Sequence, residues 1–212
     1  MDIEKHIKKI TIDSKAYPEA LRKIKNPPRQ LYIIGNERIL NSESVAIIGS
    51  RSATEIGKDR ARKWSNTLSS QGITIISGMA KGIDTQAHIG AIETKGNTIA
   101  VMGTGFGTIF PKENENLFNK IIKQNGAIVT EYDYNIGISS HQFIERNRIV
   151  SGLAKAVLII EAKYRSGTTT TASFAKREGR KIFCIPHDID DKSGYGTNYL
   201  IKKRCRTCEF TK

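Results

Sequence analysis

Short apolar runs recur along the chain, and each is followed by a longer segment in which apolar and polar residues mix. Within each run the apolar residues are continuous rather than alternating, which is typical of strands buried on both faces of a parallel sheet. We therefore predict a strand at each run. The predicted strands are residues 45–49, 73–77, 98–103, 127–131, 156–162 and 181–186.

The mixed segments between these runs are predicted to be helices. In the first, Ile56, Ala61, Trp64 and Leu68 recur at spacings of three to five residues, which is typical of a helix with one apolar face. The predicted helices are residues 54–70, 83–95, 113–126, 142–153 and 168–178. Strands that alternate with helices predict an α/β fold with a doubly wound, mostly parallel sheet, which is an extended Rossmann-like fold.

The first part of the chain has a different pattern. Residues 1–40 contain two consecutive prolines, Pro27 and Pro28, and one short strand-like run at 31–35. We expect residues 1–40 to form a short N-terminal extension packed on the core. A Rossmann-like domain over residues 41–204 and a C-terminal tail over residues 205–212 complete the expected organisation.

The chain is strongly basic, with 34 Lys and Arg against 21 Asp and Glu and a formal net charge of +13. The surplus is +4 over residues 1–30, +1 over residues 31–140 and +8 over residues 141–212. Such an excess indicates either a polyanionic partner, most often nucleic acid, or a lysine-rich solvated surface. Charge alone leaves both interpretations open.

Several classes of protein are disfavoured by what the sequence lacks. No apolar run approaches the roughly 20 residues of a membrane span, and the N-terminus has no secretory signal, so we expect a cytoplasmic protein without membrane contact. Cys205-x-x-Cys208 supplies two ligands where a structural zinc site has four, so no metal is expected. Neither G-x-G-x-x-G nor G-K-[ST] occurs, so no cofactor is expected.

Four loops at one edge of the predicted sheet are rich in Gly, Ser and Thr. Ligands of doubly wound sheets bind at the carboxyl ends of the strands, where glycine backbones and helix N-termini attract anions. Arg51 can hold a phosphate with two parallel hydrogen bonds. Turn chemistry alone explains any single loop, but four loops together favour an anion site. The candidate residues are Gly49, Ser50, Arg51, Thr54, Gly78, Lys81, Gly82, Ser166, Gly167, Thr168 and Thr169.

Two further groups of side chains carry alternatives. Asp84 and His88 lie one helical turn apart and form either an acid–base pair or, as we favour, a structural pair in which Asp84 caps the helix. On the helix over 142–153, Phe143, Arg146 and Asn147 share one side, whereas Arg148 lies elsewhere. Either Arg146, Asn147 and Arg148 grip a phosphodiester beside Phe143, or Phe143 is core and the arginines are solvated or ion-paired. The polar Asn147 in that face favours binding. No catalytic residue is predicted.

Seven segments, in order, resemble the DNA-processing protein A family, also called DprA or Smf. They span residue 17 to about residue 202. The segments are YPEALRKIKNPPRQLYIIGN, VAIIGSRSATEIG, ISGMAKGIDTQAHIGAI, TIAVMGTGFGTIFPKEN, FIERNRIVSGLAKAVLIIEA, SGTTTTASFAKREGRKIFCIP and SGYGTNYLI.

The resemblance implies a non-enzymatic protein that binds single-stranded DNA, usually as a homodimer. Members of the family protect incoming single strands during natural transformation and help to load the RecA recombinase. Carried over to this chain, the turn at residues 49–51 would hold a backbone phosphate. Arg146, Asn147 and Arg148 would line the same basic pocket, with Phe143 available to a base and residues 166–170 completing it.

The sequence departs from the family pattern at several places. Ser139, Ser140 and His141 stand where many members have a proline and a basic residue, and His187 replaces a glycine. The chain also stops where many members continue into a small winged-helix-like domain, so we expect it to represent a minimal core. Two other classes stay open. One is a nucleotide-binding Rossmann sensor or a nucleoside-monophosphate N-glycosidase-like enzyme, although residues 166–169 lack that enzyme's paired glycines and glutamate. The other is a structural assembly module.

Overall fold

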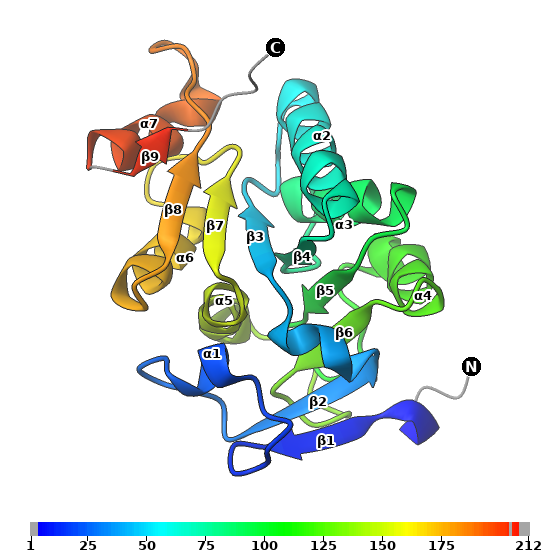
Figure 1. The fold of residues 1–212 in the computed structure, drawn as a ribbon. Helices are drawn as coiled ribbons and strands as arrows, with labels where there is room; N and C mark the ends of the chain where they lie inside the picture. The colour runs from blue at the N-terminus through cyan, green and yellow to red at the C-terminus, as the bar shows by residue number, and fades with distance from the viewer. Residues whose placement is uncertain (1–3, 204, 208–212) are drawn as a thin grey trace.

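A mostly parallel β-sheet runs through the molecule (Figure 1). The computed structural model describes residues 4–203 and 205–207. Within these residues the sheet has nine strands in the order β1-β2-β6-β5-β4-β3-β7-β8-β9. They are β1 (Lys8–Thr11), β2 (Gln30–Gly35), β3 (Ser44–Ile48), β4 (Thr74–Ser77), β5 (Thr98–Val101), β6 (Ala127–Thr130), β7 (Ala156–Ile159), β8 (Lys181–Cys184) and β9 (Arg206–Thr207).

Helices connect the strands. The α-helices are α1 (Glu19–Arg22), α2 (Glu55–Ser70), α3 (Ile83–Glu93), α4 (Glu115–Lys123), α5 (Ser140–Leu153), α6 (Gly167–Arg177) and α7 (Tyr195–Lys202). Short 3-10 turns are η1 (Glu4–His6), η2 (Glu37–Asn41), η3 (Lys112–Asn114) and η4 (Lys192–Gly194). The six predicted strands correspond to β3 through β8 and the five predicted helices to α2 through α6, so the α/β prediction is confirmed.

The sheet grows in two directions from β3. Strands β4, β5 and β6 follow on one side of β3, whereas β7, β8 and β9 follow on the other, and all of these pairs are parallel. The carboxyl ends of β3 and β7 therefore form the topological switch point of the sheet, which is where doubly wound folds bind ligands. In the N-terminal extension, β2 pairs antiparallel with β6 and β1 with β2. The domain boundaries themselves stay predictions.

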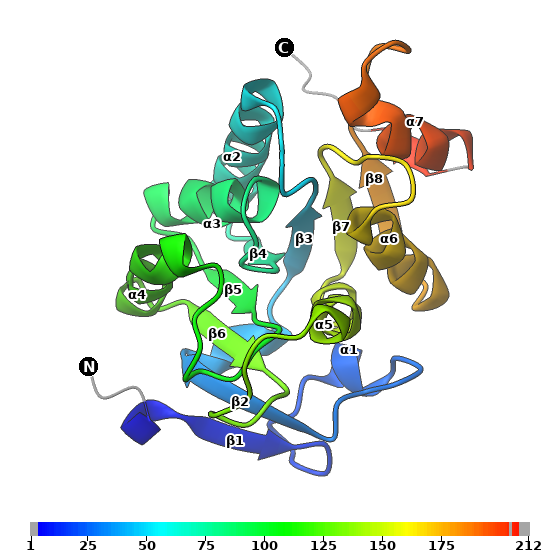
Figure 2. The ribbon, with the colours of Figure 1, turned by 180° about the vertical axis from the view of Figure 1, so that it is seen from behind.

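Helices cover both faces of the sheet. Helices α1, α5 and α6 contribute side chains to one hydrophobic cluster, whereas α2 and α3, and separately α4, pack on the opposite face (Figure 2). Successive strand residues point to opposite faces, so Ile48 joins the α5 side and Ile47 the α2–α3 side. Both faces are buried, and this is why the strand sequences are continuous apolar runs.

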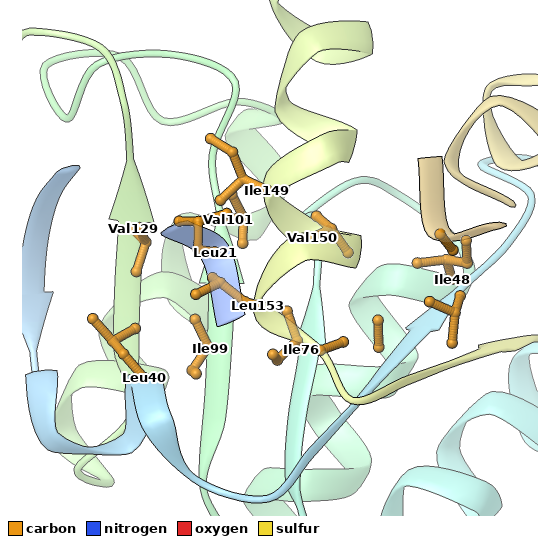
Figure 3. Packing of buried hydrophobic residues seen from close by; sticks show 14 of the residues in the cluster. Leu21, Leu40, Ile48, Ile76, Ile99, Val101, Val129, Ile149, Val150 and Leu153 are labelled. Carbon is orange, nitrogen blue, oxygen red and sulfur yellow. The ribbon is translucent and has the colours of Figure 1, made fainter. Parts of the chain in front are cut away.

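Helix α5 is anchored to the sheet by its last two turns. Ile149, Val150 and Leu153 are buried against sheet residues such as Ile76 and Val101 (Figure 3). Each fully buried side chain of this size contributes roughly 1.5–3 kcal/mol to folding. The first turns of α5 extend beyond this core toward the switch point, so the packing fixes where their side chains lie.

The C-terminal end of the described chain also joins the sheet. Strand β9 pairs parallel with β8, with Cys184 opposite Thr207. Cys184 and Cys205 are free thiols, and Cys208 lies outside the described residues. The described part of the chain contains no group of three or more His, Cys, Asp or Glu residues placed to hold a metal ion. In residues 4–203 and 205–207, no helix combines the length and the apolar character needed to cross a membrane.

Candidate nucleic-acid interface

A cavity of about 760 Å³ opens at the carboxyl ends of β3 and β7. Its wall is built from the turn after β3, the loop after β4, the first turns of α5 and the loop that leads into α6. The structure thus brings together segments that are far apart in the sequence. Ten predicted site residues line it: Gly49, Ser50, Arg51, Gly78, Phe143, Arg146, Asn147, Ser166, Gly167 and Thr168.

The turn after β3 is fixed from two sides. The Ser50 N–H donates to the Glu161 carbonyl at 2.8 Å, and the Ser50 carbonyl accepts from the Ile83 N–H at 3.2 Å. Gly82, which has φ 76°, packs so closely on the Ser50 carbonyl that a side chain there would collide with it. The backbone of the turn is therefore rigid, whereas the Arg51 side chain is exposed at the cavity.

Arg51 lies beside two aromatic rings. Its guanidinium carbon is 5.4 Å from the centre of the Phe143 ring, and the Phe110 ring centre lies 5.4 Å from the same ring with a tilt of 38°. These residues and Lys81 line a smaller recess of about 190 Å³ next to the cavity. A cation beside aromatic surface can hold a phosphate and a base of the same strand.

Arg146 forms the base of the cavity and is only 3% exposed. Its guanidinium donates to the carbonyls of Gly78 and Val101, and its Nε donates to Asn147 Oδ1 at 3.3 Å. A Cβ at Gly78 would lie 2.6 Å from the guanidinium carbon, so only glycine permits this contact. Burial and the nearby Arg51 cation lower the pKa of Arg146 to about 10, which leaves it charged at neutral pH.

Asp84 also lies at the bottom of the cavity, beside Arg146. Its Oδ2 accepts from the Gly78 N–H at 3.1 Å and from the Ala80 N–H at 3.3 Å. Burial raises the pKa of Asp84, while the Arg146 cation acts in the opposite direction. We call Gly78, Asp84 and Arg146 the cavity floor.

His88 lies behind the floor and is fully buried. Its Nδ1 is 2.7 Å from Thr98 Oγ1, and burial lowers its pKa to about 3. The imidazole does not line the cavity. The Asp84 carboxylate accepts from backbone N–H groups of the loop after β4 rather than bonding His88. The expectation that Asp84 caps the helix is wrong, because the N-cap position of α3 is Gly82, without a side-chain cap.

Three exposed cations surround the opening, and we call Arg51, Lys163 and Arg165 the cavity rim. With Arg146 they make four basic side chains on the cavity wall against one acidic side chain, Asp84. The rim cations belong to the loops after β3 and β7, which flank the switch point. A polyanion is therefore attracted to the opening.

Arg148 lies away from the cavity. It is 9% exposed, with Nη2 at 2.6 Å from Glu131 Oε2 and Nε at 3.6 Å from Glu145 Oε2. The reason is helical geometry, since Arg148 is two residues beyond Arg146 and so projects from another side of α5. Of the Arg-Asn-Arg segment, the structure places Arg146 and Asn147 on the cavity wall and commits Arg148 to carboxylates.

The remaining predicted residues support the loops. The Thr54 hydroxyl accepts from the Gly57 N–H at 3.0 Å and caps α2. The Thr169 hydroxyl accepts from the Ser166 N–H at 3.0 Å and donates to the Ser166 carbonyl at 2.7 Å. Lys81 lines the smaller recess and is ion-paired with Glu113. Neither Thr54 nor Thr169 is on the cavity wall.

Glu161 was missed by the sequence reasoning. It is 1% exposed, and its Oε2 accepts from the Thr54 N–H at 3.1 Å and from the Thr54 hydroxyl at 3.0 Å. Its carboxylate thus lies at the start of α2, where dinucleotide-binding folds hold a pyrophosphate. A lone acidic residue near the end of the apolar run 156–162 was the signal that could have revealed it.

The structure also locates two residues at which the sequence departs from the family pattern. Ser140 lines the cavity. His187 lies in the loop after β8, where its Nδ1 is 3.0 Å from Asp191 Oδ2 and its Nε2 is 2.9 Å from the Ile160 carbonyl. The imidazole is therefore part of the packing of this loop, and it does not line the cavity.

Comparison with known proteins gives consistent matches. Residues 8–211 match the sequence model of the DNA recombination-mediator protein A family. Protein Smf of Escherichia coli strain K12 is 38% identical over 194 residues, which are 92% of this chain and 52% of that protein. The chain thus spans about half the length of this curated relative.

Two solved structures are similar over most of the chain. The X-ray structure of DNA processing protein A from Streptococcus pneumoniae matches with a TM-score of 0.90 and 35% identity, covering 97% of this chain and 73% of the other. DNA processing protein A from Helicobacter pylori, whose structure describes its single-stranded DNA binding mode, matches with a TM-score of 0.85 and 30% identity. That match covers 95% of this chain and 91% of the other.

Proposed function

We propose that this chain, which belongs to the DNA recombination-mediator protein A family, binds single-stranded DNA in the cavity at the switch point. The observation that carries the proposal is the convergence of the three rim cations and the Phe143 ring on one opening. Arg51 and its neighbours bind backbone phosphates, and Phe143 contacts a base. The Helicobacter pylori relative, which binds single-stranded DNA, supports the same function.

The shape of the site favours a single strand over a duplex. A cavity of about 760 Å³ admits unpaired bases and their sugars, whereas the bases of a duplex are stacked and paired inside the helix. Phosphate contacts carry no sequence information, and aromatic rings stack on every base. Binding is therefore expected to tolerate any sequence and to weaken steeply with salt.

The site favours binding without catalysis. Among the described residues, Asp84 is the acidic side chain on the cavity wall, and both of its bonded N–H groups belong to the loop after β4. A nucleoside-monophosphate N-glycosidase needs a carboxylate free to face the scissile bond. Glu161 is engaged with Thr54 and is absent from the wall. Release of free base from nucleoside monophosphates by the purified protein would overturn this part of the proposal.

The test is a titration of fluorescein-labelled oligothymidine followed by anisotropy at several salt concentrations. We expect preference for the single strand over a duplex of equal length. Arg51→Ala should weaken binding at least tenfold for every sequence, because hydrogen bonds between charged groups are worth about 1.5–3 kcal/mol. The unfolding free energy should be unchanged.

Arg177→Ala is the matched control for this variant. Arg177 is also exposed and also lies over a phenyl ring, at 5.3 Å from the centre of Phe174, but it does not line the cavity. This control should bind oligothymidine like the unchanged chain. Equal affinity for duplex and single strand, or equal losses in the two variants, would contradict the proposal.

The wider role is also a proposal, because this chain spans only part of its relatives. We infer that it acts in the cytoplasm as a homodimer that protects single strands and helps a RecA-type recombinase to bind them during DNA uptake or recombination. The family membership supports this role. Light scattering with and without oligonucleotide tests the dimer, and recombinase filament formation on strands pre-bound by this protein tests the loading.

A further inference from the structure

We propose that Tyr164 and Tyr199 form a second base-binding position, outside the cavity, for the same DNA strand. The inference rests on the proposed single-stranded DNA binding and extends it. Tyr164 belongs to the loop between β7 and α6, and Tyr199 lies on α7. We call these two residues the tyrosine pair.

The tyrosine pair is an exposed aromatic surface. The two ring centres are 5.1 Å apart in an edge-to-face arrangement. Tyr164 is 49% exposed and Tyr199 is 40% exposed, although aromatic side chains of this size usually bury most of their surface. In an edge-to-face pair only one ring has a face covered by the other ring, so aromatic surface remains on which a planar group such as a nucleobase can stack.

Cations accompany both rings. The Arg165 guanidinium carbon is 5.4 Å from the centre of the Tyr164 ring, and Lys203 Nζ is 5.8 Å from the centre of the Tyr199 ring. Aromatic rings flanked by basic side chains are the combination that binds single strands without sequence preference, because the cations meet phosphates while the rings meet bases.

The tyrosine pair is continuous with the cavity. Lys163 and Arg165, the two sequence neighbours of Tyr164, both line the cavity wall. Arg165 therefore belongs to the cavity rim and contacts the Tyr164 ring as well. A strand that leaves the cavity past Lys163 and Arg165 meets the tyrosine pair next.

A packing role alone does not account for these side chains. Helix α7 is already held by the Gly196 N–H, which donates to the Ala162 carbonyl at 2.7 Å, and by Asn198, whose side chain bonds both backbone groups of His187. Leu200 and Ile201 also pack against the main core cluster. The tyrosine rings can therefore serve a ligand without being needed to attach the helix.

The experiment compares two oligonucleotides on the full chain. A dodecamer of thymidine can fill the cavity and reach the tyrosine pair, whereas a trimer can fill only the cavity; trimer affinity is measured by competition. The double variant Tyr164→Leu/Tyr199→Leu should bind the dodecamer about tenfold more weakly, since stacking on an aromatic ring contributes this order of affinity per base. Its affinity for the trimer should be unchanged.

Two controls separate stacking from packing. The double variant Tyr164→Phe/Tyr199→Phe keeps the rings and should bind the dodecamer normally. Phe174 lies two turns along α6, and its ring also lies beneath an arginine side chain. Phe174→Leu removes this ring and should have no effect on binding. A direct readout on the unchanged chain is photocrosslinking of a 4-thiothymidine dodecamer, which should label Tyr164 or Tyr199.

The outcomes distinguish this inference from the proposed function. Normal dodecamer binding by the leucine variant, or the absence of crosslinks at both tyrosines while the unchanged chain binds, overturns the tyrosine pair alone. If the leucine variant fails to fold, the crosslinks decide. Failure of the unchanged chain to bind either oligonucleotide overturns the proposed function and this inference together.

Discussion

The cavity floor and the cavity rim each contain an arginine, which is buried in the floor and exposed in the rim. Arg146 in the floor is buried, and its guanidinium is bound to two backbone carbonyls. Arg51 in the rim is exposed, and its guanidinium lies over the Phe143 ring. A buried arginine that satisfies backbone carbonyls holds the wall together, whereas an exposed one remains available for a phosphate. We infer that the floor gives the site its shape and the rim gives it affinity.

The strongest test of this division is Arg146→Ala. Removing the guanidinium leaves the Gly78 and Val101 carbonyls without their donor and Asp84 without its neighbouring cation. Breaking a buried charged interaction costs about 3–5 kcal/mol, so the unfolding free energy should fall by that amount in urea titrations. Arg62→Ala, which removes an exposed ion pair with Glu93, is the control and should cost about 0–1 kcal/mol. The comparison fails if the two variants are equally stable.

A second test uses the pH dependence of stability. Burial lowers the folded pKa of His88 from 6.5 to about 3, so between these values the unfolded chain binds a proton that the folded chain does not. The contribution of His88 to stability is therefore complete above pH 6.5 and is lost as the pH falls toward 3. At about pH 5 the loss is about 2 kcal/mol.

His88→Gln should remove this part of the pH dependence, because glutamine does not titrate and can still bond Thr98. The measurement is urea unfolding of both proteins at about pH 7 and about pH 5. The raised pKa of Asp84 has the opposite effect on the pH dependence of stability, because Asp84 binds a proton more readily in the folded chain than in the unfolded chain. Asp84 is present in both proteins, so its effect cancels in the comparison. An unchanged slope in the variant would show that His88 does not stay neutral in the folded chain.

The smallest expected effect belongs to the rim. Lys163→Ala should change the unfolding free energy by less than about 0.5 kcal/mol, because the side chain is exposed. The plot of log affinity for oligothymidine against log salt should become shallower by about 0.7, the value for one phosphate contact with a single strand. A stability loss comparable to that of Arg146→Ala would erase the distinction between rim and floor.

The sequence predicted the central sheet well, and the reason is physical. Strands β3 to β8 are buried on both faces, so their apolar runs stand out from the mixed helices. The candidate loops lie together because each of them leaves the carboxyl end of a strand. Strands β1 and β9 carry no comparable signal, since they are short edge strands with mainly exposed residues.

The roles of individual side chains were harder to predict. The segment Arg146-Asn147-Arg148 resembles one basic group, yet Arg148 pairs with Glu131 and Glu145 while Arg146 meets carbonyls of other loops. Those partners are distant in the sequence, so no local pattern specifies them. Helical periodicity placed Arg148 away from the face of Phe143, but the expectation that Arg148 lines the same pocket as Arg146 was wrong.

The carboxylate of Glu161 at the start of α2 affects which phosphate-containing ligands can compete with DNA for the site. A cell contains free nucleotides as well as DNA strands, and both carry phosphates. The helix start that would suit a nucleotide's diphosphate already accommodates a charge of the same sign, held by Thr54. A small anion arriving there meets repulsion, whereas a long strand can bypass α2 and engage the cations on either side of the switch point. We therefore expect the chain to favour a polymer over a free nucleotide because of a residue that need not touch DNA.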